Sequence, residues 1–461
     1  MLAKKHADFF QALLGARATV QPDDLLEYGR DRTRVFSSKA SIILFPKATA
    51  EVQTIVRYCS DSRLAFVPSG GRTGYAGAAM ATNGEVVISF EKMNRIVQID
   101  LESGTAEAES GVILENLQLA VAEKGMMFPI DFGARGSCQI GGCISTNAGG
   151  HKVIKYGMTR EQVLGLEVVT PQGEILNLNA NLHKNNSGYD LKQLFIGAEG
   201  TLGLITRATL RLVPKPARLQ LSIIAFNQLN NALSLLRHAR LTGLNITAYE
   251  FIAGPCMEAV QAYRPQSLHP FSATYPFYAL LEIDESAIDL QTFLESLSDQ
   301  SVFEDAVIAS TPEIFKSMWA LRDTISESIF HMGRFHKSDV AVPVSKMADF
   351  VKALEDMLTG NFSDCQIFLF GHIGDGNIHV NLVDRNQRGE ETFSKETEKM
   401  ESQICELIRR YDGSISAEHG IGLLKKNLLA KRRPPQDLVL MRNLKAVLDP
   451  LNLCNPGKIV D

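Results

Sequence analysis

The chain has 461 residues, of which 45% are hydrophobic and 21% are charged, and its formal net charge is −5. A chain of this length exceeds what one hydrophobic core usually holds, so we expect two or three domains. The acidic balance argues against a nucleic-acid-binding protein, which needs clustered lysine and arginine. No stretch approaches the roughly twenty apolar residues of a membrane-spanning helix. The seven cysteines include no CxxC pair, which predicts a reducing compartment, the cytoplasm.

Helical and strand patterns alternate from residue 1 to about 216. Strand patterns at 41–46 and 64–68 flank a helical pattern over 48–63 with Thr49 as its N-cap, which predicts a βαβ unit. Next come a strand at 85–90, a helix over 112–125, a glycine-rich stretch to 150 with little regular structure, and a strand at 202–213. PKP at 214–216 interrupts the pattern, so we place the end of a first domain, 1–216, there.

A second domain, 217–422, shows a strand-helix-strand rhythm that predicts an antiparallel sheet with helices on one face. Its expected elements are strands at 219–226, 277–284 and 305–310 and helices over 227–241 and 287–299. The stretch 423–461 is predicted to form a short helical segment. The fold class expected for the whole chain is therefore α+β.

The stretch GHIGDGNIHVN at 371–381 is where we expect the chemistry. Asp375-Gly376 is typical of a two-residue type I′ hairpin turn, which would pair His372 with His379 across the strands. Cross-strand neighbours lie about 5 Å apart, close enough to share an ion, and Asn381 follows on the same face. Glu418 in SAEHGIG is a third expected ligand. Two histidines and one carboxylate leave open coordination positions, as in catalytic metal sites.

Two other interpretations of these residues stay open at this point. The histidines can be ordinary hairpin residues, with Glu418 a solvated carboxylate. Alternatively, the same three residues can activate water in a metal-dependent hydrolase. A third class is a flavin or metal binder without enzymatic activity.

Small residues dominate two further segments, PSGGRTGYAGAA at 68–79 and FPIDFGARGSCQIGGCISTNAGG at 128–150. Small residues let backbone N–H groups approach an anion closely. Neither segment matches the dinucleotide-binding or P-loop motif, so a purely structural loop at 68–79 stays an alternative. We interpret Cys138 and Cys143 in the second segment as packing residues.

Seven motifs in this order resemble a known family: PSGGRTGYAG, GSCQIGGCISTNAGG, YG, GYDLKQLFIGAEGTLG, GHIGDGNIHVN, SAEHGIG and NPGK. The chain resembles the FAD-dependent D-2-hydroxyacid dehydrogenases of the vanillyl-alcohol oxidase-type flavoproteins, and most closely the D-2-hydroxyglutarate branch. The resemblance implies a two-subdomain FAD-binding domain of the PCMH type and a substrate, or cap, domain. It implies a divalent metal, zinc in this interpretation, on His372, His379 and Glu418. His419 would be the catalytic base and would also contact substrate.

The resemblance also implies an FAD site in which the pyrophosphate lies on the loop after residue 68 and the flavin ring along 129–150. Because the loop at 68–79 has neither His nor Cys, we expect the FAD to be non-covalent. Cys143 stands where branch members often have Asn. The implied cofactor residues are Pro68, Ser69, Gly70, Gly71, Arg72, Thr73, Gly74, Gly77, Ala78, Pro129, Gly133, Gly136, Ser137, Ile140, Gly141, Gly142, Ser145, Thr146, Asn147, Gly150, Tyr156, Gly157, Glu199, Gly200, Ile205 and Asn455.

The expected substrate residues are Arg322, Ser326, Lys337 and Asn381, together with His419. Arg322 and Ser326 are four apart and share one face of a predicted helix. With Lys337 they resemble the site for a second carboxylate in the D-2-hydroxyglutarate branch, and a solvated helix face is the alternative for Arg322. The expected substrate is D-2-hydroxyglutarate, then D-malate, ahead of D-lactate or glycolate.

The implied reaction transfers a proton to His419 and a hydride to the flavin and yields the 2-oxo acid. The electrons would pass to a carrier such as electron-transferring flavoprotein or a quinone. We expect no nucleic-acid partner and no membrane span, and a homodimer is one interpretation of the assembly.

Overall fold

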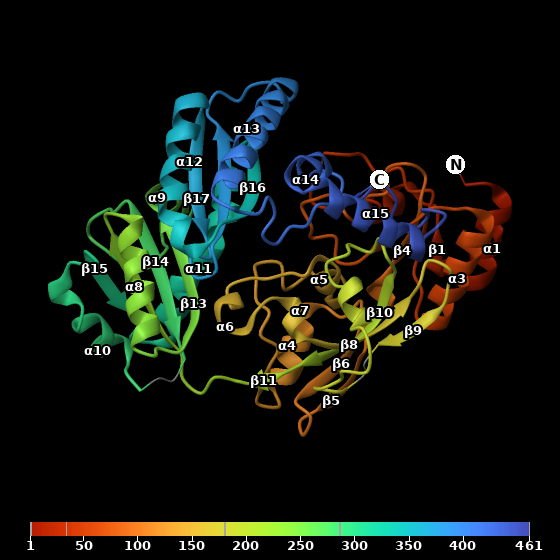
Figure 1. Ribbon diagram of the computed structural model, residues 1–461, viewed down its shortest axis with the longest axis horizontal. Coiled ribbons are helices and arrows are strands. Elements are labelled where there is room, and N and C mark those ends of the chain that lie inside the picture. Colours follow the sequence, from red (N-terminus) through yellow and green to blue (C-terminus); the bar gives the residue numbers. More distant parts are fainter. Residues whose placement is uncertain (1, 34, 179–180, 285–286, 461) are drawn as a thin grey trace. The chain divides into compact units, whose positions relative to one another are not determined.

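The computed structural model describes residues 2–33, 35–178, 181–284 and 287–460 (Figure 1). The chain divides into two compact units, each of which is built from more than one segment. Unit 1 comprises Met1–Gly149, Gly157–Lys215 and Glu418–Asp461, and unit 2 comprises Gly150–Tyr156 and Pro216–Ala417. Among the described residues, no helix is long and apolar enough to cross a membrane.

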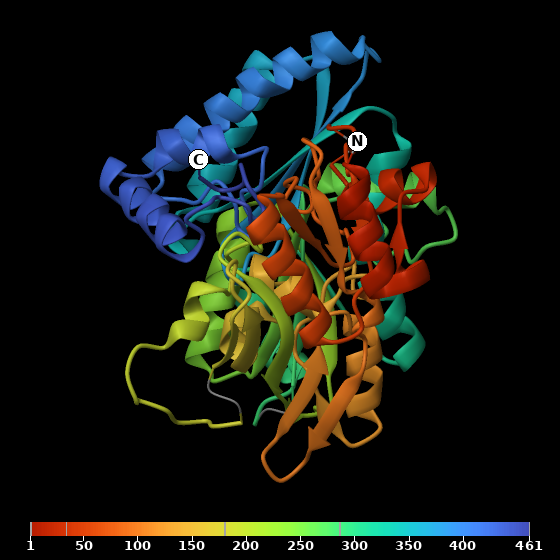
Figure 2. The same cartoon turned by 90° about the vertical axis from the view of Figure 1, so that its right-hand side faces the viewer.

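The first sheet of unit 1 contains the predicted βαβ unit. Its order is β1-β2-β4-β3, with β2, β4 and β3 parallel and β1 antiparallel, and helix α3 connects β2 to β3. Thr49 is the first residue of α3 and not its N-cap, which is Ala48, because the Thr49 hydroxyl donates instead to Glu167 at 2.6 Å. Figure 2 shows the red helix α1 and the orange helix α3 beside these strands. The bounds are α1 Lys4–Leu14, β1 Ala18–Thr19, α2 Pro22–Tyr28, β2 Ile42–Leu44, α3 Thr49–Ser62, β3 Phe66–Ser69 and β4 Val86–Ser89.

The second sheet of unit 1 is antiparallel, with the order β5-β6-β10-β8-β9. The glycine-rich stretch before residue 150, expected to be irregular, contains helix α5. Its two glycines give it low helix propensity, but Ile140, Cys143 and Ile144 pack into the core of this subdomain and hold the helix. The bounds are β5 Ile96–Asp100, β6 Thr105–Glu109, α4 Leu114–Ala122, β7 Met126–Met127, α5 Ile140–Thr146, α7 Thr159–Gln162, β8 Val163–Val169, β9 Ile175–Leu178, β10 Leu204–Arg211 and β11 Val213–Pro214.

The segment from Glu418 onward returns to unit 1 and forms two helices, α14 (Lys426–Arg432) and α15 (Pro435–Leu448). Beyond them, Cys454 pairs with Phe66 in a parallel bridge at the edge of the first sheet. The side-chain amide of Asn455 donates to the carbonyl groups of Ala78 and Glu199. The C-terminal segment is therefore part of the first subdomain and joins it to the loop that carries Glu199.

Unit 2 is built on an antiparallel sheet of seven strands, in the order β15-β12-β14-β13-β17-β18-β16. The predicted antiparallel sheet is confirmed. The strand bounds are β12 Gln220–Phe226, β13 Ile246–Ala253, β14 Phe277–Ile283, β15 Asp305–Ile308, β16 Phe335–Ala341, β17 Cys365–Gly371 and β18 Asn377–Asp384.

Helices cover both faces of this sheet, and not one face as the sequence suggested. Ile252 and its neighbours on one face pack against α9 and α11 in a single apolar cluster. Tyr249, whose side chain points to the other face, donates from its hydroxyl to Ala232 of α8 at 2.8 Å. The helix bounds are α6 Val153–Tyr156, α8 Leu229–Leu241, α9 Gly254–Tyr263, α10 Leu290–Glu295, α11 Pro312–His331, α12 Met347–Asn361 and α13 Glu390–Arg410.

The hairpin β17–β18 has a longer turn than the sequence predicted. Phe370 pairs with His379, so four residues, Ile373 to Gly376, form the turn. Gly376 has φ of +91° but Asp375 has no positive φ, which rules out the type I′ turn. The predicted pairing of His372 with His379 is therefore wrong by two residues. Because side chains alternate along a strand, a shift of two keeps both histidines on one face.

Candidate active site

One face of the unit 2 sheet carries polar side chains where β13, β17 and β18 meet. Phe251 pairs with Gly371, which places Glu250 opposite His372. Strand β16 adds Asp339 opposite His379. On these strands the neighbouring positions of the same face, such as Ile252 and Phe370, belong to the apolar core under α9 and α11. The polar group thus continues a buried face, and each of its charges needs a partner there.

Glu250 is the centre of this polar group. Its side chain is fully buried, and one carboxylate oxygen, Oε1, lies 2.6 Å from Nδ1 of His372. The other oxygen, Oε2, accepts a hydrogen bond of 2.8 Å from Nε of Arg322 on α11. His151, from the short segment of unit 2 that precedes α6, places Nδ1 3.4 Å from the same Oε2 and Nε2 3.4 Å from Asp323.

The electrostatics of this group follow from its burial and its pairing. Burial alone would raise the pKa of Glu250, but His372, Arg322 and His151 together hold that pKa well below its usual range. Burial likewise acts to lower the pKa of His151, and the neighbouring Glu250 and Asp323 outweigh it and raise that pKa to about 9. Glu250 is therefore a carboxylate at neutral pH, next to the Arg322 cation.

His379 has a carboxylate partner of its own. Its Nδ1 lies 3.3 Å from Asp339 Oδ1, and Asp339 also accepts hydrogen bonds from the side chain of Asn377 and the backbone N–H of Ala417. Burial lowers the pKa of His379 to about 3, so this imidazole is neutral at physiological pH. A neutral imidazole has a lone pair for a metal, whereas a protonated one has none.

These residues fit a divalent metal ion. The imidazole rings of His372 and His379 lie 5.4 Å apart between centroids, and a buried carboxylate adjoins Nδ1 of each, which leaves Nε2 as the ligand atom of both. The amide nitrogen of Asn381, on the same face, is buried and has no hydrogen-bond partner among the described residues, as expected for a group that binds a ligand. Glu418 directly follows Ala417, whose N–H binds Asp339.

A second set of ligand-type atoms, from His151, Glu250 and His372, lies within 4.8 Å of one another. Both oxygens of Glu250 already have partners, and one of these partners is the Arg322 cation. A cation bound here would face that arginine in a buried setting, which is unfavourable. We therefore regard this set as a hydrogen-bonded network around Glu250 and not as a metal site.

Sequence reasoning missed Glu250 and His151 as parts of this site. Their partners lie far away in the chain, and no local spacing connects them. One signal was available: Glu250 is a charged residue within ITAYEFIA, a strand of otherwise uncharged residues that is buried throughout.

Of the three residues expected to bind a second carboxylate, Arg322 is the best defined. It is buried, and its guanidinium lies over the Phe370 ring at 4.7 Å, so it is not part of a solvated helix face. Nε is bonded to Glu250, whereas the terminal nitrogens have no hydrogen-bond partner among the described side chains and backbone. Ser326, one turn further along α11, is exposed, and Lys337 pairs with Asn381 across β16 and β18.

The predicted pyrophosphate loop lies in unit 1, directly after β3. The backbone N–H groups of Gly70, Gly71, Arg72 and Thr73 donate to no acceptor in the described chain, so four consecutive donors are left for an anion. Arg72 has a φ of +56°, and its guanidinium lies 4.3 Å from the centre of the Tyr28 ring. The N–H of Gly77 donates to Asp31 at 2.9 Å and is already occupied.

This loop packs closely against the second glycine-rich segment. A Cβ on Gly71 would lie 2.2 Å from the carbonyl oxygen of Ser137, and one on Gly141 would lie 2.6 Å from Cβ of Ser110. By contrast, a Cβ on Gly142 would meet nothing within 4 Å, and the buried Oε1 of Gln139 has no partner within the described residues. Free space next to Gly142 and a nearby acceptor on Gln139 without a partner in the described chain are both consistent with a bound cofactor.

The remaining predicted cofactor residues of unit 1 are spread over the same loops. Glu199 is buried and accepts hydrogen bonds from the N–H groups of Ile421 and Gly422 at 2.7 and 2.8 Å. A Cβ on Gly200 would lie 2.4 Å from Pro68. Buried residues in this set are Ser69, Gly77, Pro129, Ile140, Gly141, Gly200, Ile205 and Asn455; partly exposed ones are Pro68, Thr73, Ala78, Ser145, Thr146, Asn147 and Gly157; exposed ones are Gly74, Gly133, Gly136 and Ser137.

Three further predicted residues are distributed between the units. His419, the expected base, belongs to unit 1, where its ring lies 5.3 Å from that of Tyr75. Gly150 and Tyr156 belong to unit 2, where Tyr156 lies 5.1 Å from the Lys155 ammonium group. Cys138 and Cys143 are buried in unit 1 with their sulfur atoms 3.6 Å apart, in agreement with a packing role. The roles of all these residues toward FAD and substrate stay predictions.

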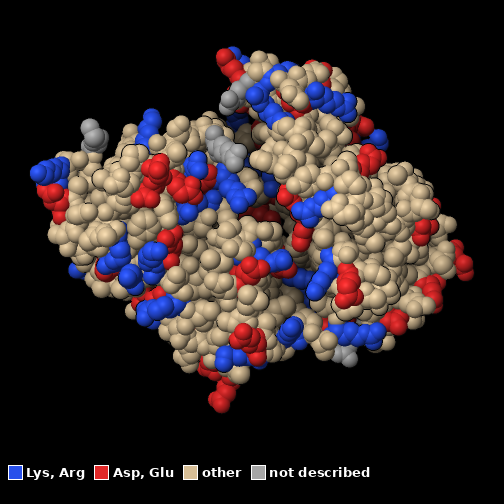
Figure 3. All heavy atoms as spheres, turned by 180° about the vertical axis from the view of Figure 1, so that it is seen from behind, with Lys and Arg blue, Asp and Glu red and all other residues tan. Residues whose placement is uncertain are grey.

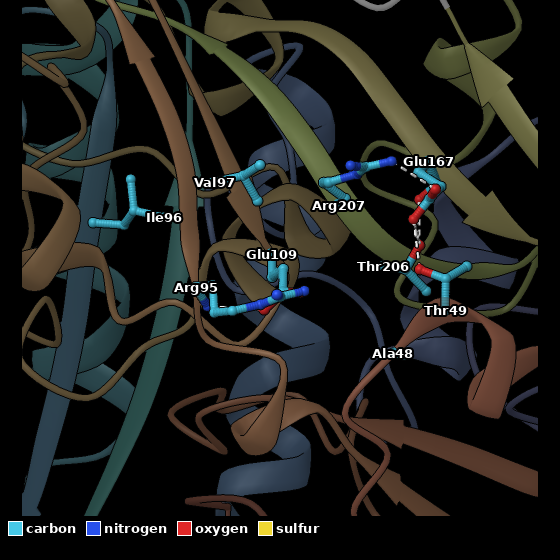
Figure 4. A pocket seen from close by; sticks show the side chains of 9 residues that line it. All are labelled: Ala48, Thr49, Arg95, Ile96, Val97, Glu109, Glu167, Thr206 and Arg207. Carbon is cyan, nitrogen blue, oxygen red and sulfur yellow. Dashed lines mark hydrogen bonds and ion pairs between the residues drawn. The ribbon is translucent and has the colours of Figure 1, made fainter.

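A pocket of about 340 Å³ in unit 1 is lined by none of the predicted site residues (Figure 4). Its charged side chains neutralise one another, since Arg95 pairs with Glu109 and Arg207 with Glu167, so we assign it no role in the chemistry. On the face shown in Figure 3, basic and acidic side chains are interspersed, without the broad basic field that nucleic-acid binding requires.

Two family models match the chain. The model of the C-terminal domain of FAD linked oxidases matches residues 215–459, and that of an FAD binding domain matches residues 40–179. The first alone spans more than half of the sequence. The chain belongs to the FAD-linked oxidases.

Relatives of this FAD-linked oxidase include curated proteins named D-2-hydroxyglutarate dehydrogenase. The protein from Stutzerimonas stutzeri (strain A1501) is 41% identical over 442 residues, which cover 95% of this chain and 94% of that protein. The mitochondrial protein from Bos taurus is 36% identical over 457 residues, which cover 98% of this chain and 82% of that protein. The sequence-based family assignment is thus confirmed.

Solved structures show the same fold. The 4-ethylphenol oxidase from Gulosibacter chungangensis gives a TM-score of 0.79 at 17% identity and covers 99% of this chain and 96% of its own. The p-cresol methylhydroxylase gives 0.76 at 17% identity, with the same coverage. The α+β fold is therefore confirmed, while the family models and the relatives named above confirm the oxidoreductase class. The match to the FAD-linked oxidases argues against the alternative of a metal-dependent hydrolase.

Proposed function

We propose that this FAD-linked oxidase oxidises a D-2-hydroxy acid that has a second carboxylate to the 2-oxo acid, with D-2-hydroxyglutarate as the first candidate and D-malate as the next. Similarity over nearly the whole chain to the D-2-hydroxyglutarate dehydrogenases supports the reaction. The observation that supports the substrate class is Arg322. Its Nε is held by Glu250 and its terminal nitrogens have no hydrogen-bond partner among the described residues, so a planar fork is available for a carboxylate.

The chain's own residues would divide the work as follows. Arg322, Ser326 and Lys337 would hold the second carboxylate, and Asn381 would donate from its unpaired amide to an oxygen of the hydroxy-acid end. His419 would take the proton of the substrate hydroxyl on an imidazole nitrogen. FAD, when bound, supplies the acceptor for the hydride of the substrate's Cα.

We further propose that His372, His379 and Glu418 hold a divalent cation, for which zinc suits two imidazoles and one carboxylate. Such an ion lowers the pKa of a bound hydroxyl and so assists its deprotonation. The neutral state of His379 and the carboxylates beside both histidines support this ligand set. The FAD would be held non-covalently, since the loop at 68–79 has no His or Cys, and acid precipitation should then leave all flavin in the supernatant. An electron carrier such as electron-transferring flavoprotein or a quinone would reoxidise the flavin.

The test is anaerobic bleaching of the flavin by a panel of D-2-hydroxyglutarate, D-malate, D-lactate and glycolate. D-2-hydroxyglutarate should give the largest kcat/KM. Arg322→Lys keeps the positive charge and loses the planar fork, so it should lower kcat/KM for D-2-hydroxyglutarate by about ten- to a hundredfold, the value of a charge-assisted contact, and leave D-lactate nearly unchanged.

Arg264→Lys is the matched control, because Arg264 forms an exposed ion pair with Glu327 on α11. Equal losses on both substrates in Arg322→Lys, or a wild-type preference for D-lactate, would show that the protein does not select a second carboxylate through this residue.

A further inference from the structure

We propose that Glu250 is a positioning residue that fixes the orientation of both the metal ligand His372 and the substrate-binding Arg322. Metal affinity and selectivity for a second carboxylate then depend on one buried side chain. This inference rests on the proposed function. It is drawn from contacts within unit 2, where strand β13 carries Glu250, β17 leads to His372, and α11 carries Arg322.

The two oxygens of Glu250 are divided between the two partners. Oε1 lies 2.6 Å from Nδ1 of His372, and Oε2 accepts from Nε of Arg322 at 2.8 Å. The carboxylate is fully buried, so water does not compete for either contact. A rigid carboxylate bound at both oxygens fixes the relative position of an imidazole and a guanidinium on different elements.

The contact with His372 selects its tautomer. A carboxylate at Nδ1 keeps the N–H on that nitrogen and directs the lone pair of Nε2 outward. Carboxylates of this kind orient metal-binding histidines, and their loss typically lowers metal affinity about 10–100-fold. Asp339 lies 3.3 Å from Nδ1 of His379, a longer contact than that between Glu250 and His372.

The contact with Arg322 selects which of its nitrogens stay available. Because Glu250 takes Nε, the two terminal nitrogens point away from that bond and can bind a carboxylate in parallel. The Phe370 ring below the guanidinium, at 4.7 Å, restricts its plane further. Without Glu250 the guanidinium would be free to turn, and its charge would lie uncompensated near the metal ligands.

His151 also contacts Glu250. Its ring lies 3.4 Å from Glu250 Oε2 on one side and 3.4 Å from Asp323 on the other, and the Trp319 ring is 4.9 Å away. His151 thus adds a third contact to Glu250 and links it to Asp323 of α11. A carboxylate that only served to neutralise charge would not require contacts to two separate functional groups.

The experiment compares Glu250→Gln, Glu250→Asp and the control Glu282→Gln in the full-length, FAD-loaded protein. Glu282 is also a buried carboxylate of this sheet, on β14, and it contacts Lys152, Thr247 and Trp319 but neither His372 nor Arg322. Two readouts are measured: the Kd for Zn²⁺ by competition with a chelator, and the ratio of kcat/KM for D-2-hydroxyglutarate over D-lactate.

Glu250→Gln should weaken Zn²⁺ about 10–100-fold and lower the substrate ratio about tenfold or more, with FAD content unchanged. Glu250→Asp restores the charge, but its shorter side chain cannot reach both partners, so at least one readout should stay impaired. Glu282→Gln should leave both readouts within about twofold, because it touches neither group.

Several results would overturn the proposal. One is a Glu250→Gln variant with wild-type Zn²⁺ affinity or wild-type substrate ratio, and another is full recovery of both in Glu250→Asp, which would reduce Glu250 to a counterion. If Glu250→Gln does not fold, the Asp variant alone decides in the same manner. A wild-type protein that binds no metal or has no preference for the dicarboxylate would instead refute the proposed function, so the two failures are distinguishable.

Discussion

The polar face of the unit 2 sheet and the glycine-rich loops of unit 1, the two regions for which we propose binding roles, are built in opposite ways. In unit 2 the binding groups are side chains, and each charged one is held by another buried side chain, as Glu250 holds His372 and Arg322. In unit 1 they are backbone groups, as in the four N–H donors from Gly70 to Thr73, which have no acceptor in the described part of the chain.

This difference predicts different effects of substitutions in the two units. A side-chain site can lose one group while the fold persists, because the sheet beneath it is covered by α8, α9 and α11. A backbone site has no side chain to remove, and it is altered by adding atoms where loops approach closely. Substitutions in the unit 2 site should therefore lower the reaction rate, whereas substitutions in the unit 1 loops should lower FAD affinity or the stability of the fold.

The largest effect is expected for His379→Ala, which tests the side-chain site. A catalytic metal stabilises the transition state by several kcal/mol, so loss of one of its ligands should lower kcat/KM for D-2-hydroxyglutarate about 10³-fold, while FAD stays bound. Metal analysis and flavin absorbance check this together. The control is His269→Ala, which changes an exposed histidine. Full metal content in His379→Ala would contradict the ligand assignment.

An intermediate effect is expected for Glu199→Gln, which changes a buried carboxylate of unit 1 that accepts hydrogen bonds from two backbone N–H groups. Burial raises the pKa of Glu199 from 4.5 to about 7, against the lowering effect of the Ile421 and Gly422 N–H groups. Between pH 4.5 and 7 the folded protein keeps this proton and the unfolded chain has released it, so wild-type stability falls as the pH rises through this window and levels off above it.

The variant lacks this dependence. Its unfolding free energy relative to wild type should increase by about 2 to 3 kcal/mol between pH 4.5 and 7, at 1.36 kcal/mol for each pKa unit. Denaturant unfolding of the FAD-free protein at several pH values measures it, with exposed Glu102→Gln as control. A pH profile parallel to that of wild type would show that Glu199 ionises normally.

The smallest effects are expected for two neighbouring glycines of α5 and test the backbone site. Gly142→Ala adds a methyl group where protein atoms leave room, so it should keep the fold and weaken FAD binding about tenfold through steric conflict with the cofactor. Gly141→Ala adds one 2.6 Å from Ser110, so it should lower stability by about 1–3 kcal/mol. Flavin titration and thermal unfolding distinguish them. Unchanged FAD affinity in Gly142→Ala would place the cofactor elsewhere.

Local patterns predicted much of this molecule. The β2-α3-β3 unit, the antiparallel sheet of unit 2 and the shared face of His372, His379 and Asn381 follow from periodicity that the sequence displays directly. The hairpin register did not, because an Asp-Gly pair also occurs in longer turns and only tertiary pairing decides between them. Helix α5 was missed because core packing overrides the low helix propensity of its glycines.

The part of the candidate site that the sequence did not reveal is the set of partners of the binding groups. Glu250 precedes His372 by 122 residues, and His151 lies in a segment that crosses into unit 2 from unit 1. No spacing rule connects such positions. The one local sign of a special role for Glu250 was a charged residue within a strand of otherwise uncharged residues.

The return of the chain to unit 1 at Glu418 has a consequence for biosynthesis. A ribosome adds residues from the N-terminus, and domains generally fold as they emerge. Residues 216–417 are complete before Cys454 can bridge to Phe66 or Asn455 can bind Ala78 and Glu199. Unit 2 can thus fold during translation. Unit 1 contains the residues that are made first, but it cannot be completed until its C-terminal segment has emerged.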